Sequence, residues 1–381
     1  LPGAHARTVI VLGFDGFAWR YLDADSAPAL HAFARGGVST IRGMIPSFPT
    51  VTFSNFYALA TGLYPDHSGI VNNRFFEPGF DSAFVYKDPI AHEARWWGGE
   101  PIWVTAQKQG VTAASMFWVG SEAPIEGMQP ALWHWFDPTV EFSARVDTLL
   151  AWLDLPEVGR PRLVMGYFEE PDKQGHRHGP DAPETHAAVL RVDSALARLT
   201  SGLRSRGLYD SVDVVIVADH GMTAISRDRV VYLDDVVDSA SVQVVNLSPN
   251  LMIAARDGDD DALLARLRKL PHVTAWKKAD VPVRLHYGAN ARITPIVGVA
   301  DPRWMIEWRH GTPYADGGEH GYDNASLDMR ALFLARGPDF RAGATIEEFP
   351  NVDVYDLLAR LLGITPAPND GTLAPLAPLL R

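Results

Sequence analysis

The chain has 381 residues, of which 47% are hydrophobic and 21% are charged, and this balance excludes a disordered or fibrous protein. Its formal net charge is −12, so its long-range field repels nucleic acid and acidic lipid, and we expect no stable nucleic-acid complex. The absence of cysteine excludes disulfides, thiolate zinc ligands and cysteine nucleophiles.

Four apolar, β-rich runs resemble buried strands that stop at a polar or glycine-containing segment. In chain order they are 8–14, 162–168, 212–218 and 331–335. Helical patterns cover 143–155 and 183–206, and Gly207 closes the second as a left-handed cap. This alternation predicts an α/β fold whose mostly parallel sheet has helices on both faces. Ligands bind such sheets beyond the carboxyl ends of the strands.

Residues 228–310 break the strand-helix alternation. Strand-like pieces at 242–246, 250–255, 292–300 and 304–308 surround a helical pattern near 260–269, so we expect a small appended α+β lobe. A last amphipathic helix is predicted at 352–362. We therefore predict a single catalytic domain over 1–381 with 228–310 as an inserted lobe. No apolar run approaches the ~18 residues that a membrane span requires.

Metal-ligand side chains occur in four short segments. Each segment alone has an ordinary alternative, a helix cap for an Asp or a turn for Asp-His-Gly, but several of them follow predicted core strands. Six carboxylates and imidazoles match two metal ions with three protein ligands each, and the mixture of oxygen and nitrogen favours zinc. The candidates are Asp15, Asp172, His176, Asp219, His220 and His320, with His178 as an alternative to His176.

A cluster of hydroxyls stands where the loop at 46–51 enters a helix that ends at Gly62. A hydroxyl at a helix N-terminus meets unpaired N–H groups and the positive end of the dipole, which favour a phosphate and a developing alkoxide. Sequence patterns leave Thr50, Thr52 and Ser54 equally possible as a nucleophile. The competing interpretation is that Thr52 is only an N-cap residue.

In combination, the motifs resemble the nucleotide pyrophosphatase/phosphodiesterases of the alkaline phosphatase superfamily. The matching segments, in order, are GFDGF, TFSNFYALATGLYPDHSGI, WWGGEPIWVTAQKQG, YFEEPDKQGHRHGP, DHGM, GEHGYDN and ITPAPNDGT. They cover most of the chain outside the predicted lobe. The resemblance implies an alkaline-phosphatase-like fold and a compact, bacterial-type catalytic domain.

The resemblance also assigns roles to residues. It implies one zinc ion on Asp172, His176 and His320, and another on Asp15, Asp219 and His220, together with Thr52 as ligand and nucleophile. Asn73 matches an asparagine that donates to a phosphate oxygen. Phe53 and Tyr167 match rings that hold the nucleotide base by stacking, an interaction that tolerates any base.

By that resemblance, the enzyme would hydrolyse nucleotide phosphodiesters and pyrophosphates to nucleoside 5′-monophosphates through a phosphothreonine intermediate. A phosphomonoesterase, a lipid phosphodiesterase and a binding protein with structural metals remain alternatives. Val51, Ser54 and Phe56 differ from the lysine, proline and histidine common in animal members, so substrate preference can differ. The chain starts Leu-Pro-Gly without methionine, which we interpret as a processed periplasmic or secreted protein or a trimmed chain.

Overall fold

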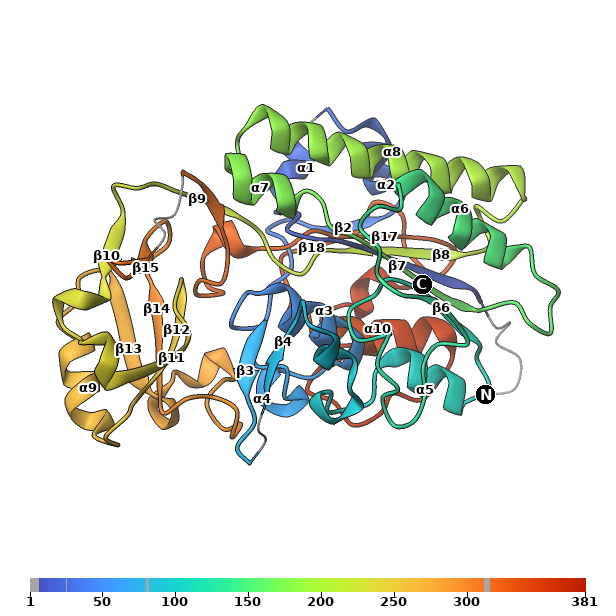
Figure 1. Cartoon of the computed structure of the whole chain (residues 1–381). Helices are drawn as coiled ribbons and strands as arrows, with labels where there is room; N and C mark the ends of the chain where they lie inside the picture. The colour runs from blue at the N-terminus through green and yellow to red at the C-terminus, as the bar shows by residue number, and fades with distance from the viewer. Residues whose placement is uncertain (1–6, 25, 80–81, 312–315) are drawn as a thin grey trace.

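The computed structural model describes residues 7–24, 26–79, 82–311 and 316–381. Residues 1–6, on which the expectation of a processed export product rests, lie outside the described residues. Figure 1 shows a large twisted sheet between two layers of helices, with a smaller sheet beside it. The α/β class predicted from the strand-helix alternation is confirmed.

The main sheet has eight strands, and its most buried members are the long apolar runs of the sequence. Their order across the sheet is β18 (Thr345–Ile346), β2 (Val38–Thr40), β17 (Phe333–Arg336), β8 (Asp213–Val217), β1 (Val9–Phe14), β7 (Leu163–Phe168), β5 (Ala113–Met116) and β6 (Leu132–His134). All except β17 run in one direction, since only the pairings of β17 with β8 and β2 are antiparallel.

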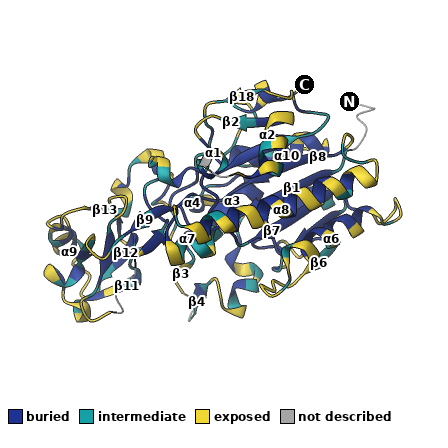
Figure 2. Ribbon diagram, turned by 90° about the horizontal axis from the view of Figure 1, so that it is seen from above, coloured by how far each residue is buried: buried dark blue, intermediate teal, exposed yellow. Residues whose placement is uncertain are grey.

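Helices cover both faces of this sheet (Figure 1). One layer contains α1 (Tyr21–Ala24), α2 (Pro28–Gly36), α6 (Phe142–Leu153), α7 (Asp172–His178) and α8 (Pro183–Ser205), and the other contains α3 (Thr52–Thr61), α4 (Pro65–Ser68), α5 (Ile102–Lys108) and α10 (Asp353–Leu362). In Figure 2, the central strands are buried and α8 exposes only its outer stripe, the pattern of an amphipathic helix on a sheet. Gly207 has the expected left-handed φ of 65°.

The region predicted as a lobe contains a second, antiparallel sheet in the order β11 (Val242–Asn246), β12 (Asn250–Ala255), β14 (Ile296–Ala300) and β13 (Val273–Lys277). Helix α9 (Asp260–Leu267) packs on it, and β10 (Val230–Tyr232) pairs separately with β15 (Met305–Glu307). These elements share a hydrophobic cluster distinct from the main core. The boundary at 228–310 itself stays a prediction.

Two short ribbons complete the chain. Strand β9 (Thr223–Ile225) pairs with β16 (Gly317–Glu319), so the connections into and out of the smaller sheet run side by side, and β3 (Arg74–Phe76) pairs with β4 (Ala83–Val85). No helix in the described ranges combines the length and apolar character needed to cross a bilayer.

Candidate active site

The ligand-type residues gather beyond the carboxyl ends of three neighbouring strands. Strand β1 lies between β7 and β8, and Asp15, Asp172 and Asp219 follow these strands directly or within a few residues. Backbone bonds hold the three segments together, because Asp172 N–H donates to Asp15 O at 3.0 Å and Gly16 N–H donates to Asp219 Oδ1 at 3.0 Å. The parallel sheet therefore concentrates carboxylates at one edge, as its topology requires.

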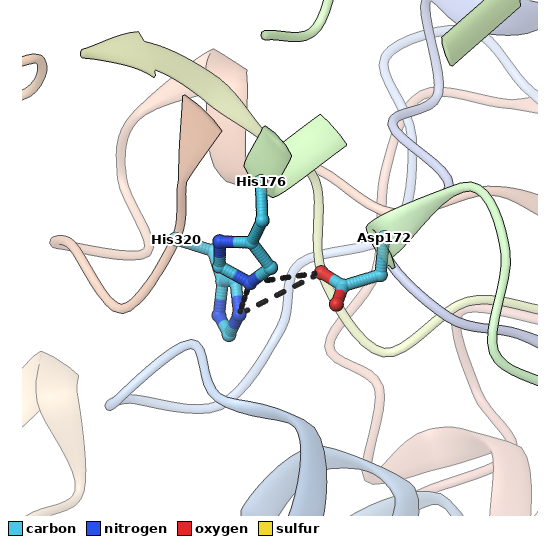
Figure 3. A group of neighbouring side chains, drawn as sticks. All are labelled: Asp172, His176 and His320. Carbon is cyan, nitrogen blue, oxygen red and sulfur yellow. Dashed lines mark hydrogen bonds and ion pairs between the residues drawn. The ribbon is translucent and has the colours of Figure 1, made fainter. Parts of the chain in front are cut away.

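One group consists of Asp172, His176 and His320, whose side chains converge in Figure 3. Helix α7 places Asp172 and His176 four residues apart on one face, and β16, which packs against α7, leads into His320. Asp172 Oδ1 lies 3.4 Å from His176 Nε2 and 3.7 Å from His320 Nε2, and the two Nε2 atoms are 3.1 Å apart. This spacing suits three ligands of one cation.

A second group consists of Asp15, Asp219 and His220, all buried. His220 Nε2 lies 2.9 Å from Asp219 Oδ2 and 3.6 Å from Asp15 Oδ1. The His220 ring stacks on the His320 ring with centroids 3.6 Å apart, so the two groups adjoin. The structure thus brings together all six residues predicted as metal ligands, whereas His178 lies exposed outside both groups.

Each carboxylate of these groups has one buried oxygen for which the described part of the chain offers no hydrogen-bond donor. Asp15 Oδ1, Asp172 Oδ1 and Asp219 Oδ2 are buried with no hydrogen-bond partner among the described residues. Burial raises the pKa of Asp15 well above its usual value, and the nearby charges of Asp219 and Asp172 raise that pKa further. A bound cation removes both penalties, so the residues present fit divalent metal ions.

The imidazole tautomers are set by backbone carbonyls. Nδ1 of His176 lies 3.0 Å from Gly318 O, Nδ1 of His220 lies 2.9 Å from Gly221 O, and Nδ1 of His320 lies 2.8 Å from Thr50 O. Since a carbonyl only accepts, each Nδ1 must donate, and Nε2 is the nitrogen that each ring directs into its group as a possible metal ligand. Sequence patterns gave no signal for these three acceptors.

Zinc binding to the metal-free chain is expected to release protons at pH 7. Burial lowers the pKa of His176, but the carboxylates of Asp172 and Glu319 outweigh this effect and raise it to about 9, so the ring is protonated at pH 7. A metal ligand must give up that proton. Below about pH 9, the affinity for zinc therefore falls by about tenfold for each unit by which the pH is lowered, for each proton released. Titrating zinc into weakly buffered apo protein measures the release; an unchanged pH would contradict the ligand assignment.

The three candidate hydroxyls have different environments. Thr50 Oγ1 donates to Tyr322 O at 3.1 Å and Ser54 Oγ donates to Ile70 O at 2.8 Å, and both residues are fully buried. Thr52 begins α3, but Val51 is the N-cap residue and no side chain caps the helix, so the interpretation of Thr52 as an N-cap is wrong. Thr52 Oγ1 instead lies 3.3 Å from His220 Nε2.

Thr52 also lines a cavity of about 950 Å³, as do the other residues with predicted substrate contacts, Phe53, Asn73 and Tyr167. The Phe53 ring packs edge-on against Tyr86 with centroids 5.2 Å apart. Asn73 Oδ1 accepts a hydrogen bond from Phe53 N–H at 3.0 Å. The cavity is at the upper end of the ~300–1,000 Å³ range of ligand pockets, so it has room for a substrate larger than phosphate.

Sequence comparison places these features in a known family. Residues 9–323 match the family described as type I phosphodiesterase/nucleotide pyrophosphatase. The chain belongs to this family. The prediction from the motifs is thereby confirmed, and the family is one of hydrolases.

Members of this family with curated sequences are similar along the whole chain. The chain is 37% identical to venom phosphodiesterase CdcPDE of Crotalus durissus collilineatus over 391 residues, covering 100% of this chain and 47% of that protein. It is 35% identical to ectonucleotide pyrophosphatase/phosphodiesterase family member 3 of Rattus norvegicus, covering 98% of this chain and 44% of that protein. The chain therefore spans about half the length of the curated relatives it matches.

Solved structures of family members superimpose closely. Murine ectonucleotide pyrophosphatase/phosphodiesterase 5, as an inactive threonine-to-alanine variant in complex with AMP, has a TM-score of 0.94 and 33% identity, over 98% of this chain and 100% of that chain. The human counterpart has a TM-score of 0.94 and 34% identity, with the same coverage of both chains.

Tyr167 has a contact that the sequence analysis missed. Only 8% of this residue is exposed, its ring packs edge-on against Phe56, and its hydroxyl donates to Asp15 Oδ2 at 2.5 Å. Tyr167 therefore orients a candidate metal ligand in addition to lining the cavity.

Three residues differ from those common in the animal members of the family. Of these, Val51 lines the cavity, whereas Ser54 and Phe56 are buried behind it.

Proposed function

We propose that this chain hydrolyses phosphodiester and pyrophosphate bonds of nucleotides and releases nucleoside 5′-monophosphates. The main support is the arrangement of two three-ligand groups with unpartnered carboxylate oxygens beside the Thr52 hydroxyl. Family membership and the AMP complex of the murine relative support nucleotides as the substrate class.

The proposed cofactors are two zinc ions per chain. Asp172, His176 and His320 would hold one, and Asp15, Asp219 and His220 the other, with Thr52 as an additional ligand. When bound, such ions supply positive charge that lowers the pKa of a coordinated hydroxyl and neutralises phosphate. All-oxygen shells would favour calcium or magnesium instead, and the three imidazoles argue against them.

The chain's own residues would then act in two displacement steps. The Thr52 oxygen forms a bond to phosphorus as the bond to the leaving oxygen breaks, which gives phosphothreonine. Water attacks this intermediate, releases the nucleoside monophosphate and restores Thr52. The Asn73 amide donates to a phosphate oxygen as charge develops there, while Phe53 and Tyr167 hold the base.

We further propose that residues 228–310 form an inserted lobe of a single domain, and that the protein acts outside the cytoplasm. The separate hydrophobic cluster supports the former. The names of the venom and ectonucleotide relatives support the latter.

The decisive activity comparison uses the 4-nitrophenyl ester of thymidine 5′-monophosphate and 4-nitrophenyl phosphate. The aromatic cavity wall binds a nucleoside, so we expect kcat/KM to be at least ~100-fold higher for the nucleotide ester, through ~3 kcal/mol of stacking. A higher kcat/KM for 4-nitrophenyl phosphate than for the nucleotide ester would indicate a phosphomonoesterase. A lysophospholipid diester serves as a third substrate, and a higher kcat/KM for it than for the nucleotide ester would indicate a lipid phosphodiesterase.

A further inference from the structure

Four asparagines lie where the smaller sheet meets the main body at the cavity wall. Asn72 and Asn73 precede β3 in the body, whereas Asn246 ends β11 and Asn250 begins β12. All four line the cavity, and Asn72 and Asn250 are only 1% and 3% exposed. Buried amides at this density need mutual hydrogen bonds, because a buried amide without a partner is destabilising.

Asn250 is the centre of this cluster. Its Oδ1 accepts from Asn72 Nδ2 at 2.6 Å and from Asn246 Nδ2 at 2.9 Å. Its Nδ2 donates to Gly321 O at 3.3 Å, directly after the candidate metal ligand His320. Asn250 thus connects the smaller sheet to two segments of the active site.

The bonds fix the direction of each amide. Asn73 N–H can only donate, so Asn72 must present its Oδ1 there, at 2.8 Å, and this leaves the Asn72 NH2 group for Asn250. Phe53 N–H likewise requires Asn73 Oδ1. The Asn73 NH2 group, for which the described residues offer no acceptor, remains for the cavity.

We propose that Asn250 is a positioning residue for catalysis. Through Asn72 it holds the backbone and amide of Asn73 in the orientation that donates to a substrate phosphate oxygen, and through Gly321 O it steadies the segment that carries His320. The inference rests on the proposed function and on the role proposed there for Asn73. It gives the smaller sheet a part in the reaction, because one of its residues sets the geometry of a phosphate contact.

A double-mutant cycle on kcat tests the proposal. Asn73→Ala should lower kcat by roughly 10²–10³-fold, the usual effect of removing one oxyanion donor. Asn250→Ala should lower kcat by about tenfold with KM nearly unchanged, because it misplaces the Asn73 donor without removing it. When Asn250→Ala is added to Asn73→Ala, kcat should fall by less than about twofold further, because the Asn73 amide that Asn250 positions is already absent.

The matched control is Leu251→Ala, which removes a fully buried side chain from the hydrophobic cluster of the same strand without touching the amides. An equal loss of kcat in Leu251→Ala, with all rates normalised to folded protein, would mean that Asn250 acts only through lobe stability and would overturn the proposal. If the loss of kcat in the double variant equals the product of the losses in the two single variants, the two residues are not coupled, and the proposal is overturned as well.

A crystal structure of Asn250→Ala tests the same point without turnover, so it separates this inference from the proposed activity. We expect Asn72 or Asn73 to change its side-chain orientation, with loss of the Asn73 Oδ1 contact to Phe53 N–H. If both side chains keep their present hydrogen bonds, the positioning role is wrong, whatever the enzyme hydrolyses. If the orientation changes but no nucleotide diester is cleaved, only the proposed function fails.

Discussion

Thr52→Ala is expected to lower kcat on a nucleotide diester by roughly 10⁴-fold or more while both metals stay bound, because it removes the attacking oxygen. Without Thr52, three candidate ligands would remain for each of the two proposed ions. Thr52→Ser should keep measurable turnover through its own hydroxyl. The measurements are steady-state rates, metal content by elemental analysis, and mass spectrometry of acid-quenched enzyme for a phosphorylated Thr52 peptide.

Ser54→Ala is the matched control for Thr52→Ala. Ser54 lies on the same helix, two residues on, but its hydroxyl donates to Ile70 O. Its loss should cost about 1 kcal/mol of unfolding free energy and leave kcat of the folded enzyme within a few-fold. A near-normal rate for Thr52→Ala would refute the nucleophile assignment, and a collapse of both variants would point to damage of helix α3.

Asp172→Asn is expected to remove one of the two metal ions and lower kcat by about 10³-fold or more, since a metal contributes several kcal/mol to charge stabilisation. Asp172 Oδ1 faces both imidazoles of its group, and a neutral amide at this position lowers the affinity of the group for a cation. Chelation of the wild-type enzyme should abolish activity reversibly and lower Tm, because the buried carboxylates then lose their counterions. Elemental analysis and thermal unfolding measure both effects.

Asp301→Asn is a suitable control, since Asp301 Oδ2 pairs with His272 Nδ1 at 3.0 Å on an exposed part of the smaller sheet. It should leave metal content and the chelator response unchanged. Recovery of no more than one transition metal ion per active wild-type chain would refute the two-metal proposal, and full activity after metal removal would exclude metal catalysis.

Strand-end carboxylates were the part of the site most accessible to prediction. The apolar runs before Asp15 and Asp219 identify buried parallel strands, and topology then places their ends together. His320 was different, because β16 has the sequence Gly-Gly-Glu and no strand pattern precedes the histidine. Only its motif indicated a role.

The remaining features depend on contacts between segments that are far apart in the sequence, so sequence patterns could not predict them. Thr50, Thr52 and Ser54 look alike in sequence, and the acceptors that separate them, Tyr322 O and Ile70 O, are distant in sequence or lie in another segment. Strands β2 and β5, each next to an edge strand of the main sheet, escaped prediction, β2 because it has only three residues and β5 because half of its four residues are alanine, which is depleted in strands. The reversed direction of β17 is set by its partners and has no local signal.

The stacked rings of His220 and His320 belong to different ligand groups, although their centroids lie only 3.6 Å apart. A replacement at either position therefore removes a flat surface against which the other ring rests. If each group holds a metal ion, as proposed, we expect a change of ligand type in one group to disturb the metal selectivity of the other.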